Sequence, residues 1–400
     1  MTTRVKFLNG LNTIGGNVIS VETKTSRVIT DFGINFAPDD TTPDDLLSSG
    51  VLPNVPDLFL DGQSSPFENE AIFISHLHID HMGGLKYLKR PIDVYMSSDS
   101  LKLYNQLIEL GVEKPTLTNL KEIDDGQTIT IGDLSVTAYL TDHDAIGALM
   151  FVIGDGEHTF VHSGDVRYDG PYPERVDRWT NIIEALNPDL FMLEGTEFSF
   201  DNDGEPRTRR TEQILQDDFA KSLSADSLVV INPYERNIER LIELQKTAEE
   251  NNRTLVWDAR FGTILESFGL SATILDRDIT LEEMVSNPSQ YVLQNHFENL
   301  SDLDEFEDGF IYLHMNGEPL GDYDSRYETL VDYLNKRHAQ FEYVGASGHA
   351  TPEDLIKVAS RVNAKVTVPW HSFKPEVEND ALIQAGLKTY LPTKNETLEF

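Results

Sequence analysis

The sequence contains no cysteine, which excludes disulfide bonds and thiolate metal sites and leaves histidine, carboxylate and water as the available metal ligands. Basic residues are scarce, since 32 lysines and arginines face 68 aspartates and glutamates, and the formal net charge is −36. Such a charge repels polyanions at long range, whereas nucleic-acid binders usually carry a basic surface. We therefore do not expect this chain to be a protein that coats nucleic acid. A metal-lined slot that holds a few phosphates remains compatible, because bound cations supply local positive charge.

Long apolar runs are also missing. No stretch approaches the roughly 20 residues that a membrane-spanning helix requires, and residues 1–9 lack the apolar core and cleavage site of a secretory signal peptide. We therefore expect a cytoplasmic protein with no membrane partner. The 400 residues, of which 39% are hydrophobic and 25% charged, are typical of a folded protein with room for two or three domains.

The pattern of predicted elements changes twice along the chain. Residues 1–200 contain short strands, and residues 338–400 return to that pattern. Between them, at 201–337, strands alternate with helical segments, which predicts an α/β domain with a largely parallel sheet. Polar motifs repeatedly follow strand ends, which is where open α/β sheets build their sites.

Residues 76–81 carry the strongest functional signal, because four metal-ligand side chains fall within six positions, directly after an apolar strand. His76 and His78, two residues apart, can face one metal ion. Asp80 and His81, beyond the turn, can face a second.

Two further histidines and one aspartate complete the predicted sites. We expect His143 to complete the first site and His371 the second. Asp165 has two carboxylate oxygens and can bridge two ions about 3.5–4 Å apart. The sequence therefore predicts two divalent metal ions. Zinc is the first choice and manganese or iron the alternative, because histidine and aspartate suit all three.

Five of the eleven histidines are interpreted as structural or surface residues. A supporting role for His162, next to the turn that carries Asp165, is equally open. These five residues are His158, His162, His296, His314 and His338.

The order His76-x-His78-x-Asp80-His81, His143, Asp165 resembles the metallo-β-lactamase superfamily. Asp31, in the strand-end sequence Asp31-Phe32-Gly33, resembles that family's first motif. The resemblance implies an αββα sandwich with a dinuclear site at one edge of its sheets.

Later motifs resemble the β-CASP branch of that superfamily, whose members are mostly nucleases. Glu194 stands at its acidic position, Ser347-Gly348-His349-Ala350 at its second motif and His371 at its third. This implies a β-CASP α/β domain at 201–337 inserted into a metallo-β-lactamase domain made of residues 1–200 and 338–400.

Within the branch, the chain is similar to the bacterial ribonuclease J family at residues 161–165, 316–319 and 347–350. A histidine at the third motif is associated with RNA-processing members. Glu194 differs from the aspartate usual in ribonuclease J, and residues 372–375 depart from the usual continuation. The chain ends soon after His371, so we expect it to lack the C-terminal domain that longer members use for oligomerisation and full activity.

The leading hypothesis is a metal-dependent phosphodiester hydrolase that acts on single-stranded RNA. It would be a 5′ exonuclease, with endonuclease activity as a further option, and a metal-bridging hydroxide would attack phosphorus. By resemblance, Asp80 orients the nucleophile and His349 contacts the scissile phosphate or protonates the leaving oxygen. Ser347, Gly348, His349 and Ala350 would bind phosphate, and Glu194 would position a metal-ligand histidine. The purely structural alternative for residues 347–350 is a glycine turn followed by a helix cap.

Other interpretations stay open. A dinuclear hydrolase of a small phosphodiester, lactone or thioester suits the acidic composition, and a non-catalytic partner of an active nuclease is a third hypothesis. The partner hypotheses include a homodimer. The arginines at 207, 209 and 210 are interpreted either as phosphate contacts or as part of a solvated linker. Arg236 and Arg240, one helical turn apart, are interpreted as surface charges.

Overall fold

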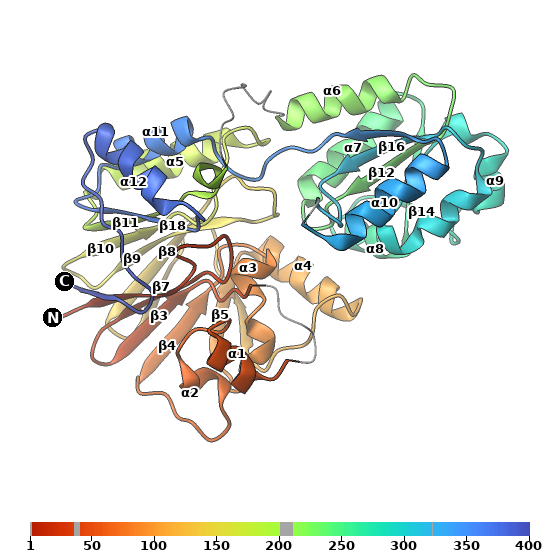
Figure 1. The fold of residues 1–400 in the computed structure, drawn as a ribbon. Coiled ribbons are helices and arrows are strands. Elements are labelled where there is room, and N and C mark those ends of the chain that lie inside the picture. The colour runs from red at the N-terminus through yellow and green to blue at the C-terminus, as the bar shows by residue number, and fades with distance from the viewer. Residues whose placement is uncertain (1, 36–40, 201–210, 322) are drawn as a thin grey trace. The chain divides into compact units, whose positions relative to one another are not determined.

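The computed structural model describes residues 2–35, 41–200, 211–321 and 323–400. Two compact units make up the chain (Figure 1). Unit 1 comprises Met1–Tyr168, Tyr172–Pro206 and Gly348–Phe400, and unit 2 comprises Asp169–Pro171 and Arg207–Ser347. The domain limits drawn from the sequence at 201 and 337 stay predictions. The arginine cluster at 207, 209 and 210 lies outside the described residues.

Unit 1 is built on two β-sheets. The first has seven strands in the order β19-β1-β2-β3-β4-β5-β6, antiparallel from β19 to β3 and parallel from β3 to β6. Its strands are β1 (Arg4–Asn9), β2 (Val18–Glu22), β3 (Ser26–Thr30), β4 (Asn69–Phe73), β5 (Asp93–Met96), β6 (Asn119–Glu122) and β19 (Thr397–Glu399).

The second sheet has six strands in the order β18-β11-β10-β9-β8-β7, parallel from β18 to β10 and antiparallel from there to β7. Its strands are β7 (Thr128–Ile131), β8 (Leu134–Leu140), β9 (Leu149–Gly154), β10 (Thr159–His162), β11 (Leu190–Glu194) and β18 (Thr367–Trp370).

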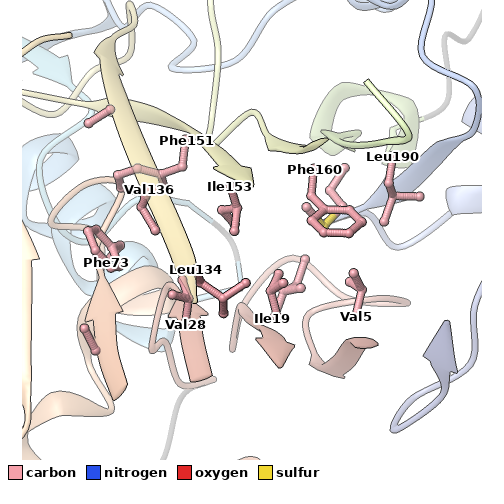
Figure 2. Packing of buried hydrophobic residues seen from close by; sticks show 14 of the residues in the cluster. Val5, Ile19, Val28, Phe73, Leu134, Val136, Phe151, Ile153, Phe160 and Leu190 are labelled. Carbon is pink, nitrogen blue, oxygen red and sulfur yellow. The ribbon is translucent and has the colours of Figure 1, made fainter. Parts of the chain in front are cut away.

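The two sheets face each other across an apolar core (Figure 2). Side chains alternate across a strand, and β11 shows the result: Leu190 and Met192 face this core, whereas Phe191 and Leu193 face helices on the other side. Those helices are α5 (Pro173–Glu184), α11 (Pro352–Val362) and α12 (Pro375–Gln384), and shorter helices accompany the first sheet. The expected αββα sandwich of the metallo-β-lactamase fold is therefore confirmed.

The helix α11 shows how local sequence fixes an element. Thr351 caps its start by accepting a hydrogen bond from the backbone N–H of Asp354, and Pro352 occupies the first turn, where its missing N–H costs nothing. Asn363 ends the helix in the left-handed conformation. The other helical segments of unit 1 are α1 (Pro43–Ser49), α2 (Pro56–Phe59), α3 (Ile79–Met82), η1 (Leu85–Tyr87), α4 (Ser98–Glu109) and η2 (Thr196–Ser199).

Unit 2 is an α/β unit with one parallel sheet of six strands in the order β14-β13-β15-β12-β16-β17. Its strands are β12 (Val229–Pro233), β13 (Thr254–Trp257), β14 (Thr273–Ile274), β15 (Tyr291–Gln294), β16 (Ile311–Met315) and β17 (Gln340–Tyr343). Its helices are α6 (Glu212–Ser222), α7 (Ile238–Glu250), α8 (Ala259–Ser267), α9 (Leu281–Val285), η3 (Pro288–Gln290), η4 (Phe297–Glu305) and α10 (Ser325–Lys336).

The interpretation of Arg236 and Arg240 as surface charges is wrong, because both side chains are buried. Arg240 pairs with Glu212 at 2.7 Å and donates to Asn316 Oδ1 at 2.9 Å. A buried arginine is tolerated when its charge and its donors are satisfied in this way. Among the described residues, no helix is long and apolar enough to cross a bilayer.

Candidate metal centre

The predicted metal ligands all lie just beyond strand ends of unit 1. His76 and His78 follow β4, and Asp80 and His81 lie in the short helix α3. The other three follow three strands of the second sheet: His143 follows β8, Asp165 follows β10 and His371 follows β18.

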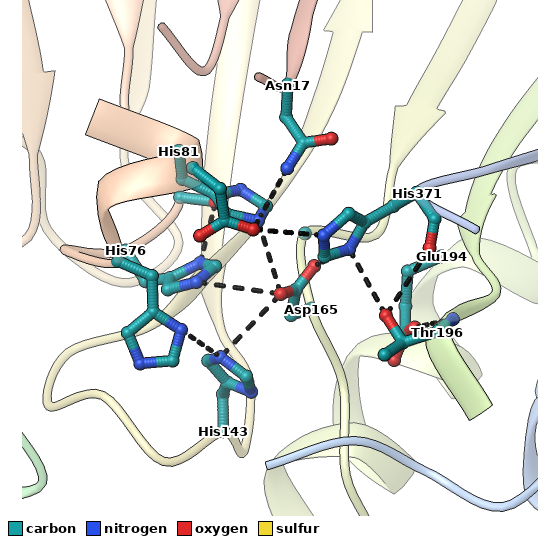
Figure 3. Close-up of polar contacts among 12 residues, drawn as sticks. Asn17, His76, His81, His143, Asp165, Glu194, Thr196 and His371 are labelled. Carbon is teal, nitrogen blue, oxygen red and sulfur yellow. Dashed lines mark hydrogen bonds and ion pairs between the residues drawn. The ribbon is translucent and has the colours of Figure 1, made fainter. Parts of the chain in front are cut away.

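The structure brings these side chains together in two groups (Figure 3). One group is His76, His78, His143 and Asp165, and the other is Asp80, His81 and His371. Within each group the donor atoms lie within 4.8 Å of one another. This is the division expected from the sequence spacing, and the role of the residues as ligands stays a prediction.

Asp165 lies within reach of both groups. Its Oδ2 is 3.6 Å from Nε2 of His76 in the first group and 3.2 Å from Nε2 of His81 in the second. Its Oδ1 is 3.0 Å from Nδ1 of His371. One carboxylate thus has an oxygen near each group, as a bridging ligand requires.

The donor atoms fit a divalent cation. Nε2 of His76 is buried without a hydrogen bond, an arrangement that is costly unless another group binds it. Burial, and then the neighbouring His81 and His143, lower the pKa of His76 well below its usual range. Burial likewise lowers the pKa of His143 to about 3. Neutral imidazoles beside an ionised carboxylate form a metal-binding donor set.

In the second group the histidine pKa values are raised, whereas those of His76 and His143 in the first group are lowered. Burial lowers the pKa of His371, but Asp165 and Asp80 outweigh it and raise that pKa to about 9. Burial also lowers the pKa of His81, but Asp165, Asp80 and Asp31 outweigh it, so this pKa lies well above its usual range. Protons and cations therefore compete for the same carboxylates, which makes metal affinity pH-dependent.

Asp31, predicted from the first motif, orients the imidazole of His81. Its Oδ2 lies 2.8 Å from Nδ1 of His81, and its Oδ1 accepts from the backbone N–H of Ser75 at 2.7 Å. The Nε2 atom of His81 consequently faces Asp165. Gly33 of the same motif lies so close to helix α3 that a Cβ would meet the Asp80 carbonyl oxygen at 1.5 Å.

The motif at 347–350 also orients a ligand. Nδ1 of His143 lies 2.5 Å from the Gly348 carbonyl, which directs Nε2 toward the first group. A Cβ at Gly348 would meet Asp144 Oδ1 at 2.3 Å, so a larger residue there would displace the Asp144 carboxylate. Ala350 does not fit its predicted phosphate role, because its side chain is buried and its N–H donates to the Val166 carbonyl at 2.6 Å.

Glu194, at the end of β11, was expected to position a metal-ligand histidine, and its side chain contacts His349. It is fully buried, and its Oε1 is 3.2 Å from Nδ1 of His349, which is outside the predicted ligand set. Burial lowers the pKa of His349, but Glu194, and then Asp165 and Asp144, raise it to about 10. His349 Nε2 lies 3.9 Å from Asp165 Oδ2, so this imidazole borders the metal groups.

Several supporting residues were missed from the sequence. Arg167 donates to Asp142 at 2.8 Å, and this fully buried ion pair joins the residue before His143 to the turn after Asp165. Arg167 lies two residues beyond Asp165, and that short offset was the available signal.

Ser347, which the sequence predicted to bind phosphate, lies half-buried at the end of unit 2.

His162 has contacts that favour the supporting role. It is fully buried, its Nδ1 accepts from the Gly164 N–H at 3.1 Å, and its ring packs 4.7 Å from that of Trp370. Burial lowers its pKa to about 4, so the acceptor nitrogen stays neutral. His162 thus holds the turn that presents Asp165.

Glu378 on α12 is a buried carboxyl group with no hydrogen bond to either oxygen. Gly195 leaves room for it, since a Cβ there would meet its Oε2 at 1.9 Å. Burial, and then the charge of Glu194, raise the pKa of Glu378 well above its usual range. The folded protein therefore binds this proton more tightly than the unfolded chain, whose glutamate pKa is about 4.3. The resulting stability is complete below about pH 4.3 and is lost as the pH rises through the folded-state pKa.

We expect Glu378→Gln to raise the free energy of unfolding at pH 7 by on the order of 1–3 kcal/mol, because glutamine needs no proton to stay neutral. The increase in the free energy of unfolding should become smaller toward pH 5. Urea denaturation at pH 7 and at pH 5 measures this difference. Glu376→Gln, at an exposed position of the same helix, is the matched control with little expected effect. Equal destabilisation by Glu378→Gln at both pH values would show that the native carboxyl is ionised.

Comparisons with known proteins give relatives over most of the chain. Residues 55–213 match the beta-lactamase superfamily domain. Ribonuclease J of Mycoplasma genitalium is 24% identical, and the alignment covers 92% of this chain and 68% of that protein. The transcription termination factor FttA of Methanothermobacter thermautotrophicus is 26% identical over 64% of this chain and 41% of its own length. The crystal structure of a protein of unknown function from Enterococcus faecalis V583 is 27% identical, covers 100% of both chains and has a TM-score of 0.86.

Proposed function

This chain is a metallo-β-lactamase superfamily protein of the β-CASP branch, and from that premise we propose that it is a metal-dependent ribonuclease that degrades single-stranded RNA from the 5′ end. Endonuclease cleavage is a further option at the same site. The observation that carries the proposal is Asp165, whose carboxylate lies within reach of both donor groups while the imidazole of His349 borders them.

In this proposal the two donor groups each hold one divalent cation, zinc first and manganese as the alternative. Bound cations would acidify water and neutralise charge on the phosphate oxygens. The surrounding residues fix the imidazoles: Asp31 orients His81, and the Gly348 carbonyl orients His143.

His349 is the group proposed to act on the phosphate itself. Glu194 holds its Nδ1, which leaves Nε2 as the donor that faces the metal groups. A cationic imidazole can donate a charge-assisted hydrogen bond to a phosphate oxygen, or a proton to the departing oxygen. Ser347, one residue before Gly348 in the chain, is proposed to hold a neighbouring phosphate together with the backbone of 348 and 349.

The test is incubation of metal-reconstituted protein with 5′-monophosphorylated single-stranded RNA, with His76→Ala as the control and products separated by size. We expect metal-dependent release of mononucleotides from the 5′ end by the wild type alone. Two salt concentrations should be compared, because the net charge of −36 repels RNA and salt screens that repulsion. Metal content is measured on the same samples by mass spectrometry.

Failure to cleave RNA or DNA with two ions bound per chain would overturn the ribonuclease proposal. The strongly acidic composition favours a hydrolase of a small phosphodiester, lactone or thioester as the second candidate. Turnover of such a substrate by the wild type, and not by His76→Ala, would establish it.

A further inference from the structure

Unit 2 exposes three large apolar side chains at the carboxyl end of its sheet. Tyr323 is 81% exposed, Tyr343 49% and Leu320 44%. Tyr343 ends β17, and Leu320 and Tyr323 lie in the segment that follows the neighbouring strand β16. Because β16 and β17 are neighbouring parallel strands, their carboxyl ends lie at the same edge of the sheet. The three side chains at this edge are here called the tyrosine surface (Leu320, Tyr323, Tyr343).

The ring of Tyr343 is held in place from behind. It stacks on the imidazole of His314, with ring centroids 5.7 Å apart and planes inclined by 27°. Its hydroxyl accepts a hydrogen bond from Asn316 Nδ2 at 2.9 Å. His314 is itself fixed, because its Nε2 lies 2.8 Å from the Pro319 carbonyl. A ligand that stacks on this ring would lose little further freedom of the side chain, since the ring is ordered beforehand.

The tyrosine surface lies near the residues proposed to bind phosphate. Tyr343 precedes Ser347 by four residues, and an extended chain spans at most about 3.6 Å per residue. The two positions are thus separated by no more than roughly 14 Å within unit 2. A strand with one phosphate at Ser347 can bring a neighbouring base to Tyr343.

Charge near the surface does not suit phosphate binding. Arg326, at the start of α10, is already paired with Asp324 at 2.6 Å and with Glu318 at 2.9 Å. Stacking of a base on an aromatic face needs no net charge and accepts every base. An aromatic surface therefore offers a protein of net charge −36 a way to hold RNA that does not depend on lysine and arginine.

We propose that Tyr343 and Tyr323 form a stacking site for a nucleobase of single-stranded RNA, next to the Ser347 phosphate position. The inference rests on the proposed ribonuclease function and names a substrate contact for it. Leu320 would border the base with an apolar contact.

The test uses metal-loaded protein and a cleavage-resistant 5′-phosphorylated oligonucleotide that carries 2-aminopurine, placed in turn at each of its first positions. We expect quenching of its fluorescence at one position in the wild type. Tyr343→Leu and Tyr323→Leu should lose that quenching and bind roughly 5- to 100-fold more weakly, which is the range for loss of one stacked base. Tyr343→Phe keeps the ring and should retain both. Tyr390→Leu, at a 40% exposed tyrosine of unit 1, is the matched control.

Two outcomes separate this inference from the proposed function. Unchanged quenching and affinity in both leucine variants would overturn the stacking site, while RNA cleavage by the wild type would leave the ribonuclease proposal intact. No RNA binding and no RNA cleavage by the wild type would overturn the proposed function and the stacking site together. A wild-type circular dichroism spectrum and a wild-type metal content show that each variant is folded and metal-loaded.

Discussion

Replacing Asp165 with asparagine is expected to reduce hydrolysis by about 10³-fold or more and to lower the bound metal below two ions per chain. The carboxylate is 1% exposed, and it lies within reach of both donor groups. Asparagine keeps the shape and removes the charge that would join the two cations. Charge stabilisation by a bound cation contributes several kcal/mol, which corresponds to roughly three powers of ten in rate.

The measurement combines metal content, by mass spectrometry, with the rate of RNA cleavage. Asp189→Asn is the matched control, because Asp189 lies immediately before β11, at the end of that strand away from Glu194. It should keep the wild-type metal content and rate. An Asp165→Asn protein that retains two ions and cleaves within tenfold of the wild type would show that this carboxylate is not the bridge.

Replacing His349 with alanine is expected to leave the metal content unchanged and to slow RNA cleavage by about 10²- to 10⁴-fold, the usual contribution of a positioned proton donor. Its imidazole contacts Glu194 at 3.2 Å and lies at the edge of the metal groups, outside the predicted ligand set. Glu194→Gln should give a smaller loss, about 10- to 100-fold, since it acts through His349.

Parallel measurements of metal content and rate distinguish this role from metal binding. His158→Ala is the control, because His158 is a partly exposed histidine next to the start of β10, at the end of that strand away from Asp165. An unchanged rate in His349→Ala would exclude the imidazole from catalysis. Loss of metal in that variant would instead make His349 a ligand.

Local patterns in the sequence were sufficient to predict how these donor side chains group. The spacing of His76, His78, Asp80 and His81 predicts two pairs of ligands, and the structure places these pairs in separate groups. The reason is physical: residues within one strand-to-helix turn have positions fixed by local geometry. The ends of β8, β10 and β18 were expected to converge for a similar reason, since sites form where strands end.

Contacts between distant segments were not accessible in this way. Glu194 and His349 are 155 residues apart, and His143 and Gly348 are 205 apart. Nothing in either local sequence says which histidine a buried glutamate will hold, so Glu194 was assigned to a metal ligand. Burial of Arg240 depends on Glu212, an acidic partner from another helix. Such compensation is decided by tertiary packing.

The order of strands in unit 1 has a consequence for synthesis of the protein. Strand β11 pairs with β18, and β1 pairs with β19, so strands that follow unit 2 in the chain complete both sheets of unit 1. Domains generally fold as they leave the ribosome, N-terminal parts first. Here unit 2 is nearly continuous and can fold as it emerges, whereas unit 1 must wait with an open sheet edge at β11. His371 arrives with β18, so a nascent chain cannot complete its second group of metal donors before the ribosome has passed that strand.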